Sequence, residues 1–172
     1  MFSIEDWSKE RVYNVMMELL YSFNYMWFLM EQWVDKNCPK ELGQKGMLQM
    51  TDEFGAYEAR RLKKTVDDKV EGIDQLISFL EHSHWAAFED LRITKISDTR
   101  MRMMTLGCTS QKAAKKWGME YYDCSEVAQR LRLAFLKEIN PKVTVTPVFL
   151  PPEKPSDDYP TGTSCEWIVS IE

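Results

Sequence analysis

The stretch MRMMTLGCTSQKAAKKWGMEYYDCSEVA, residues 101–128, decides the fold because it contains the transition from a sheet to a helix. It reads as a strand, Cys108, a short helix closed by Gly118, an aromatic loop, Cys124 and the start of a long helix. Two thiols therefore lie at the two ends of one connection. If the protein has a chemical centre, we expect it here.

A β-hairpin is predicted to include the beginning of this stretch. Apolar and polar residues alternate in 91–94 and again in 100–103, on either side of a turn at Ser97-Asp98. This period of two is typical of strands that are buried on one face. The two segments are therefore expected to pair with each other.

Two further strands are predicted after the long helix, which ends at Asn140-Pro141. In residues 143–147 the alternation includes Pro147, which lacks an N–H group, so this strand lies at an edge or carries a bulge. The last strand covers residues 164–171. One of its faces carries the apolar residues Cys165, Trp167, Val169 and Ile171.

The chain upstream of the hairpin is predicted to be helical. A first helix starts within Ser3–Asp6 and ends at Cys38-Pro39, because the residue before a proline avoids helical angles. Its apolar residues recur at helical spacing and widen beyond one face: Val12, Val15, Leu19, Leu20, Phe23, Met26, Trp27, Phe28, Met30 and Trp33. Such a helix is either sandwiched inside the domain or buried against another subunit. We expect a homodimer through it.

A second helix is predicted from about Lys40 to Thr65, followed by a turn at Asp67-Asp68-Lys69 and a third helix that begins at Gly72 and ends at His82 and His84. Gly43, Gly46 and Gly55 weaken the second helix, and we attribute them to close packing between helices. The predicted fold class is α+β: long N-terminal helices, a hairpin, two helices and two further strands of one antiparallel sheet covered by helices.

Composition limits the class of protein. A chain of 172 residues with 44% hydrophobic and 28% charged residues predicts a single globular domain over residues 1–172. The net charge of −5 argues against nucleic-acid binding. The N-terminus is unlike a signal peptide, and the most apolar window, residues 19–30, is too short and polar to span a membrane. We therefore expect a cytoplasmic protein with reduced thiols.

Three residues near the central stretch are candidates for catalysis. Cys124 immediately precedes a helix, whose free N–H groups and dipole favour a thiolate with a lowered pKa. Cys108 is a second, weaker candidate. Glu126 either accepts or donates a proton beside Cys124, or only interacts favourably with the dipole of the helix. Cys124 is alternatively structural, or part of a converging thiolate metal site. The cysteine spacing matches no zinc motif, so we predict no metal and no cofactor.

Candidate ligand-binding residues come from other segments. Trp27 and Tyr57 are expected to line a cavity with their polar tips facing inward, although core packing explains them equally well. Glu58 and Arg61, three residues apart, are expected to pair on a helix surface. Cys165 either contacts a ligand or is a buried apolar thiol. His82 and His84 are interpreted as structural.

Several short motifs together resemble a family of cytosolic prokaryotic proteins whose layout is similar to that of the L-2-amino-thiazoline-4-carboxylic acid hydrolase family. They are 24–28 (NYMWF), 54–64 (FGAYEARRLKK), Cys108 with Gly118 and Cys124, 139–141 (INP), 151–153 (PPE) and 165–167 (CEW). Where the family often has Asp-Gly before the Trp region, this chain has Asn24-Tyr25. That difference removes a carboxylate from the first helix.

The resemblance implies hydrolysis of a C–N or C–S bond in a small cyclic amidine-like substrate. Such a ring opening needs a nucleophile and a proton donor, roles that Cys124 and Glu126 would take, with Cys108 as second thiol. The sequence leaves open whether the protein is an enzyme. The alternative is a non-catalytic ligand-sensing or protein-interaction domain.

Overall fold

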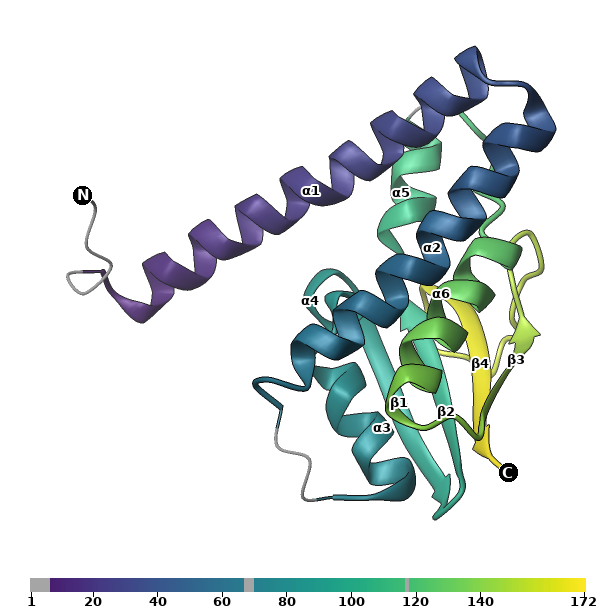
Figure 1. Ribbon diagram of the computed structural model, residues 1–172. Coiled ribbons are helices and arrows are strands. Elements are labelled where there is room, and N and C mark those ends of the chain that lie inside the picture. The colour runs from purple at the N-terminus through teal and green to yellow at the C-terminus, as the bar shows by residue number, and fades with distance from the viewer. Residues whose placement is uncertain (1–6, 67–69, 117) are drawn as a thin grey trace. The chain divides into compact units, whose positions relative to one another are not determined.

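The computed structural model describes residues 7–66, 70–116 and 118–172, and Figure 1 shows its elements in chain order. The chain divides into two compact units, Met1–Met47 and Leu48–Glu172. The single domain expected over 1–172 stays a prediction. The predicted helix start within Ser3–Asp6 and the turn at Asp67-Asp68-Lys69 lie outside the described residues.

The N-terminal unit contains helix α1 (Lys9–Asn37) and the beginning of helix α2 (Lys40–Leu62). The side chain of Ser8 caps α1 by accepting a 3.2 Å hydrogen bond from the backbone N–H of Arg11. Between the helices the chain turns tightly. A Cβ on Gly43 would lie 2.8 Å from Cγ1 of Val34, so the predicted close packing is confirmed at this glycine.

The C-terminal unit is built on a four-stranded sheet with the order β1-β2-β4-β3. Its strands are β1 (Asp90–Ser97), β2 (Arg100–Leu106), β3 (Val143–Phe149) and β4 (Thr163–Ile171). Every neighbouring pair is antiparallel, and β1 and β2 form the predicted hairpin. With the long N-terminal helices, this sheet confirms the α+β class.

Pro147 has both of the properties expected of a proline within a strand. Strand β3 is at the edge of the sheet, and its register with β4 shifts between Pro147 and Phe149. The missing N–H therefore interrupts no continuous ladder. On β4, Cys165, Trp167 and Val169 are buried on one face, as the alternation predicted.

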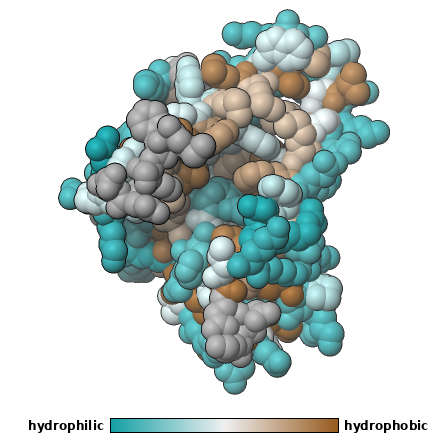
Figure 2. All heavy atoms as spheres, turned by 60° about the vertical axis from the view of Figure 1, so that its left-hand side comes forward, coloured by the Kyte–Doolittle hydropathy of each residue, from teal (hydrophilic) through white to brown (hydrophobic). Residues whose placement is uncertain are grey.

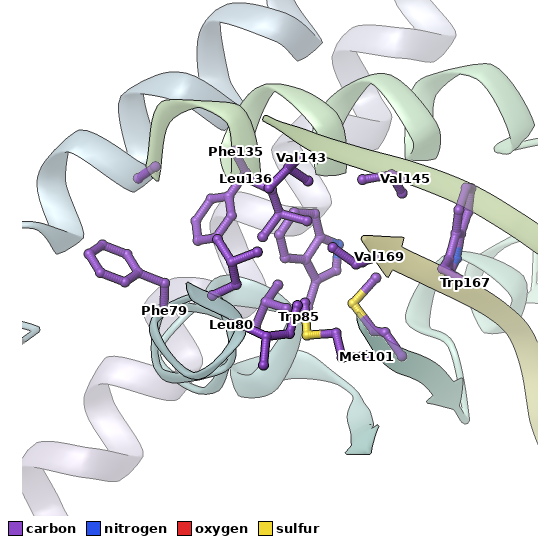
Figure 3. Close-up of a cluster of buried hydrophobic side chains, with 14 of the residues drawn as sticks. Phe79, Leu80, Trp85, Met101, Phe135, Leu136, Val143, Val145, Trp167 and Val169 are labelled. Atoms are coloured by element: carbon purple, nitrogen blue, oxygen red, sulfur yellow. The ribbon is translucent and has the colours of Figure 1, made fainter. Parts of the chain in front are cut away.

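One face of the sheet is covered by helices α3 (Gly72–Glu81), α4 (His84–Phe88) and α6 (Ser125–Ile139), with α5 (Thr109–Lys116) in the connection from β2 to α6 (Figure 1). Helix α4 was not predicted. Apolar side chains from these helices and from β2, β3 and β4 form one core, part of which Figure 3 shows. Its fully buried members include Phe79, Leu80, Met101, Phe135, Leu136, Trp167 and Val169.

The part of α2 that belongs to this unit packs on α6. A Cβ on Gly55 would lie 2.6 Å from the carbonyl oxygen of Leu131, so the two backbones approach as closely as only glycine permits. Beside this contact, Nε of Arg130 donates to Asp52 at 3.0 Å. The close packing inferred for Gly55 is confirmed, whereas Gly46 has no neighbour within 4 Å of its added Cβ.

Among the described residues, no helix combines the length and the apolar character that crossing a bilayer requires.

Candidate functional site

Three cysteines that are far apart in sequence lie within electrostatic reach of one another. Cys108 follows β2, Cys124 is the N-cap residue of α6, and Cys165 is on β4. Negative charge on Cys124 or Cys165 raises the pKa of Cys108, and charge on Cys165 raises the pKa of Cys124. The fold therefore brings together the two thiols of the central stretch and adds a third.

The pKa of Cys124 is opposite in direction to the prediction. Burial raises it to about 11, and the opposing effect of the nearby Arg132 charge is too small to reverse this. Burial also raises the pKa of Cys108 to about 12, assisted by the charge of Glu89. The expectation of a lowered pKa is wrong because desolvation outweighs the helix N-terminus. Both sulfurs are neutral thiols at pH 7.

Arg132, on the buried face of α6, is the most unusual side chain near these thiols. Only 5% of its surface is exposed. Its guanidinium carbon lies 5.2 Å from the ring centroid of Trp85 and 4.7 Å from that of Trp167. Figure 3 shows both tryptophans among the buried side chains between the sheet and the helices. The cation therefore lies over two aromatic rings.

The hydrogen bonding of this guanidinium is incomplete. Nη1 donates to the backbone carbonyl of Ala128 at 3.2 Å, whereas the buried Nε has no acceptor. Within the part of the chain that the structure describes, no carboxylate forms an ion pair with Arg132. The Nε/Nη2 edge, which is the edge that binds a carboxylate with two parallel hydrogen bonds, is therefore unused.

A second buried polar atom without a hydrogen-bond partner belongs to strand β2. Thr105 is fully buried on β2, and its Oγ1 makes no hydrogen bond. It pairs in register with Cys165, whose sulfur accepts a 3.3 Å hydrogen bond from Nε1 of Trp167. We call Thr105, Cys108, Cys124, Arg132 and Cys165 the thiol–arginine cluster. It is a group of buried polar side chains and thiols within the C-terminal unit.

The other candidates from the sequence lie elsewhere. Glu126 points to the surface, 54% exposed and 3.9 Å from Arg130, although it follows Cys124 closely in sequence. Trp27 is half-buried on α1, in the N-terminal unit. Tyr57 and Arg61 are both exposed on α2. Roles in ligand binding or catalysis for these residues stay predictions.

Glu58 pairs with a histidine and not with Arg61. Its two carboxylate oxygens accept hydrogen bonds from the backbone N–H of His84 at 2.8 Å and from Nδ1 of His84 at 2.6 Å. The carboxylate thereby satisfies the N-terminus of α4, where Ser83 makes no capping bond with its own side chain. A structural role for His84 was expected, and this contact supplies it.

Metal ligation by these side chains was the third alternative for the cysteines. The described ranges contain no group of three His, Cys, Asp or Glu residues placed to hold a metal ion. The two neutral thiols of Cys108 and Cys124 beside a guanidinium are also a poor cation site, because the positive charge of Arg132 repels a metal.

Sequence reasoning missed Arg132, although a signal was present. Residues 128, 132, 135, 136 and 139 follow the spacing of one helix face, and this spacing places Arg132 in the middle of the buried stripe. Val127 and Leu131, which hydrophobicity alone would favour for the buried face, are only half-buried. The partner of Glu58 gave no local signal, because His84 is 26 residues away.

Comparison with known proteins identifies a family. Residues 8–171 match the model of a family of unknown function, DUF6125, and the chain belongs to this family. None of the curated proteins matches the chain. The likeness to the L-2-amino-thiazoline-4-carboxylic acid hydrolase family stays a prediction, since the matched family carries no activity with it.

Proposed function

We propose that this protein binds a small carboxylate-bearing molecule at the thiol–arginine cluster, with Arg132 as the anchor. The observation that carries the proposal is the unused Nε/Nη2 edge of a guanidinium that is only 5% exposed. Arginine presents this edge as a rigid fork that matches the geometry of a carboxylate. A monocarboxylate would complete the hydrogen bonding and neutralise the buried charge together.

A buried charge without a counter-ion carries an effective desolvation penalty of several kcal/mol. The two indole rings offset part of this, since a desolvated cation–π contact contributes about 2 kcal/mol. No carboxylate of the described chain neutralises Arg132. An external anion therefore binds here with a more favourable free energy than at an exposed arginine.

The thiols favour binding over thiolate chemistry. At pH 7 Cys108 and Cys124 are protonated, because burial places their pKa values near 12 and 11. A neutral thiol is a weak nucleophile but a suitable wall for a sulfur-containing or apolar group. The proposal is therefore a ligand-binding domain. Hydrolysis of a cyclic amidine-like substrate, with Cys124 as nucleophile, would require the pKa of Cys124 to fall when the substrate binds.

The experiment uses thermal unfolding and calorimetric titration with acetate, pyruvate and benzoate, and sodium chloride as the salt control. We expect a carboxylate of this set to raise the melting temperature of the wild-type protein and to lose this effect in Arg132→Met. Arg130→Met, on the same helix but 40% exposed, is the matched control and should keep the effect. Equal responses of the wild-type and Arg132→Met proteins would contradict the proposal.

A further inference from the structure

Thr105 on β2 has a fully buried hydroxyl group that makes no hydrogen bond. A polar group at the surface, such as those drawn in teal in Figure 2, is hydrogen-bonded by water, but Thr105 is 0% exposed. Two other buried hydroxyls, those of Ser83 and Thr163, each donate to a backbone carbonyl at 2.6 Å. The hydroxyl of Thr105 therefore destabilises the ligand-free protein relative to a valine of the same shape.

The side chain of Thr105 lies on the face of the sheet that the helices cover. Met101 and Met103 are fully buried core residues of the same strand, and every second side chain of a strand is on the same face. Thr105 pairs in register with Leu91 of β1 and with Cys165 of β4. It is thus the position at which a hydroxyl interrupts an apolar row.

Cys165 connects Thr105 to the arginine of the cluster. On neighbouring antiparallel strands, directly paired residues have Cβ atoms about 5 Å apart, and diagonal neighbours lie about 7–8 Å apart. Trp167 is the diagonal neighbour of Thr105, and its Nε1 donates to the sulfur of Cys165 at 3.3 Å. The ring of Trp167 lies 4.7 Å from the guanidinium carbon of Arg132. Thr105 and Arg132 therefore border the same two residues of β4, at a separation that one small molecule can span.

Unsatisfied polar atoms are concentrated at this place. Among the residues that the structure describes, three buried side-chain atoms lack a hydrogen-bond partner: Oγ1 of Thr105, Nε of Arg132 and Oε2 of Glu166. Glu166 follows Cys165 on β4 and so belongs to the other face of the sheet. The remaining two atoms differ in chemistry, because a guanidinium N–H only donates, whereas a hydroxyl donates and accepts. A ligand that satisfies both needs an anionic acceptor and a second oxygen.

We propose that Thr105 hydrogen-bonds a hydroxyl or keto oxygen of the same ligand whose carboxylate Arg132 binds. The inference rests on the proposed function, because Arg132 supplies the anchor. It narrows the ligand class from small carboxylates to hydroxy and keto acids. Arg132 holds the carboxylate that all these acids share, and Thr105 distinguishes them from acids with a plain hydrocarbon chain, which leave its hydroxyl without a partner.

Calorimetric titration of the full chain with matched acids tests the inference. The pairs are propionate with lactate, propionate with pyruvate, and butyrate with 3-hydroxybutyrate. We expect at least one acid with the extra oxygen to bind the wild-type protein about tenfold more tightly than its parent acid. In Thr105→Val this preference should fall below about twofold, because no hydrogen bond to the extra oxygen remains. Thr105→Ser keeps the hydroxyl and should keep the preference, and Arg132→Met should bind none of the acids measurably.

Thermal unfolding without ligand provides the control. Thr105→Val should melt at an unchanged or higher temperature, whereas Thr163→Val loses the hydrogen bond to Pro160 and should melt about 2–4 °C lower. A melting temperature of Thr105→Val as low as that of Thr163→Val would show that the hydroxyl is bonded within the fold and would overturn the inference.

The titrations also separate this inference from the proposed function. Equal affinities within every pair, or a preference that survives in Thr105→Val, would overturn the role of Thr105 and leave the carboxylate site at Arg132 standing. Binding of none of the acids, or equal binding by the wild-type and Arg132→Met proteins, would overturn both.

Discussion

The guanidinium carbon of Arg132 lies 4.7 Å from the ring centroid of Trp167, and the indole N–H of Trp167 donates to the sulfur of Cys165. One tryptophan thus contacts the cation through its ring and a thiol through its edge. This arrangement gives the core of the C-terminal unit a polar centre. Two buried polar atoms of the cluster, Nε of Arg132 and Oγ1 of Thr105, make no hydrogen bond.

Replacement of Arg132 by methionine tests whether the charge stabilises the ligand-free fold. Methionine keeps the length of the side chain and removes the buried charge, so we expect the free energy of unfolding of Arg132→Met to be unchanged or up to about 3 kcal/mol higher. Urea denaturation without added carboxylate measures it. A loss of more than about 2 kcal/mol would show that the cation–π contacts, and not a missing ligand, account for the arginine.

The reactivity of Cys124 follows from its raised pKa. At pH 7 a thiol with a pKa of about 11 is almost entirely protonated, so iodoacetamide should alkylate Cys124 far more slowly than it alkylates free cysteine. Time-resolved peptide mapping measures the rate. Alkylation of Cys124 faster than free cysteine at neutral pH would restore the activated nucleophile and the hydrolytic mechanism.

Stability should fall in alkaline solution. Burial raises the pKa values of Cys108 and Cys124 in the folded state, so the folded protein favours the neutral thiols. Their contribution to the free energy of unfolding is therefore complete below the unfolded pKa near 8.5. It is lost as the pH rises through the folded values of about 11 and 12. Cys108→Ala should show a shallower decline of the unfolding free energy than wild type between pH 9 and 12. Cys38→Ala, outside the cluster, should decline like the wild-type protein.

Gly55 should tolerate no larger residue. In Gly55→Ala the new methyl group would lie 2.6 Å from the backbone oxygen of Leu131, and this overpacking should destabilise the protein by about 1–3 kcal/mol. Gly46→Ala is the matched control on the same helix, because nothing lies within 4 Å of its added Cβ. That variant should gain about 0.5–1 kcal/mol from helix propensity. A neutral Gly55→Ala would argue against close packing of α2 on α6.

Glu58 should stabilise α4 through His84. Glu58→Ala leaves the backbone N–H of His84 without its acceptor, so we expect a loss of about 1–3 kcal/mol in the free energy of unfolding. Glu120→Ala removes an exposed carboxylate and should change stability by less than about 0.5 kcal/mol. If the two variants are equally stable, the carboxylate is not the cap of this helix.

The sequence predicted those parts of the fold that local chemistry controls. Pro147 placed its strand at an edge, and the alternation around Cys165 and Trp167 identified the buried face of β4. It did not predict the partner of Glu58 or the environment of Arg132, because both depend on residues that only tertiary packing brings near. The pKa of Cys124 was predicted in the wrong direction for the same reason. The position of Cys124 at a helix start is visible in sequence, whereas the tertiary packing that buries its sulfur is not.

The central claim is that the Nε/Nη2 edge of Arg132 binds a carboxylate, and nuclear magnetic resonance of the arginine side-chain Nε–H groups tests it most directly. The signal of Arg132 is assigned by its absence in Arg132→Met, and acetate, pyruvate and benzoate are titrated against sodium chloride. We predict that a carboxylate of this set moves the Hε signal of Arg132 downfield and saturates, while the signal of Arg130 stays in place. An Hε signal of Arg132 that responds to none of the three carboxylates, or only as it responds to chloride, would contradict the account.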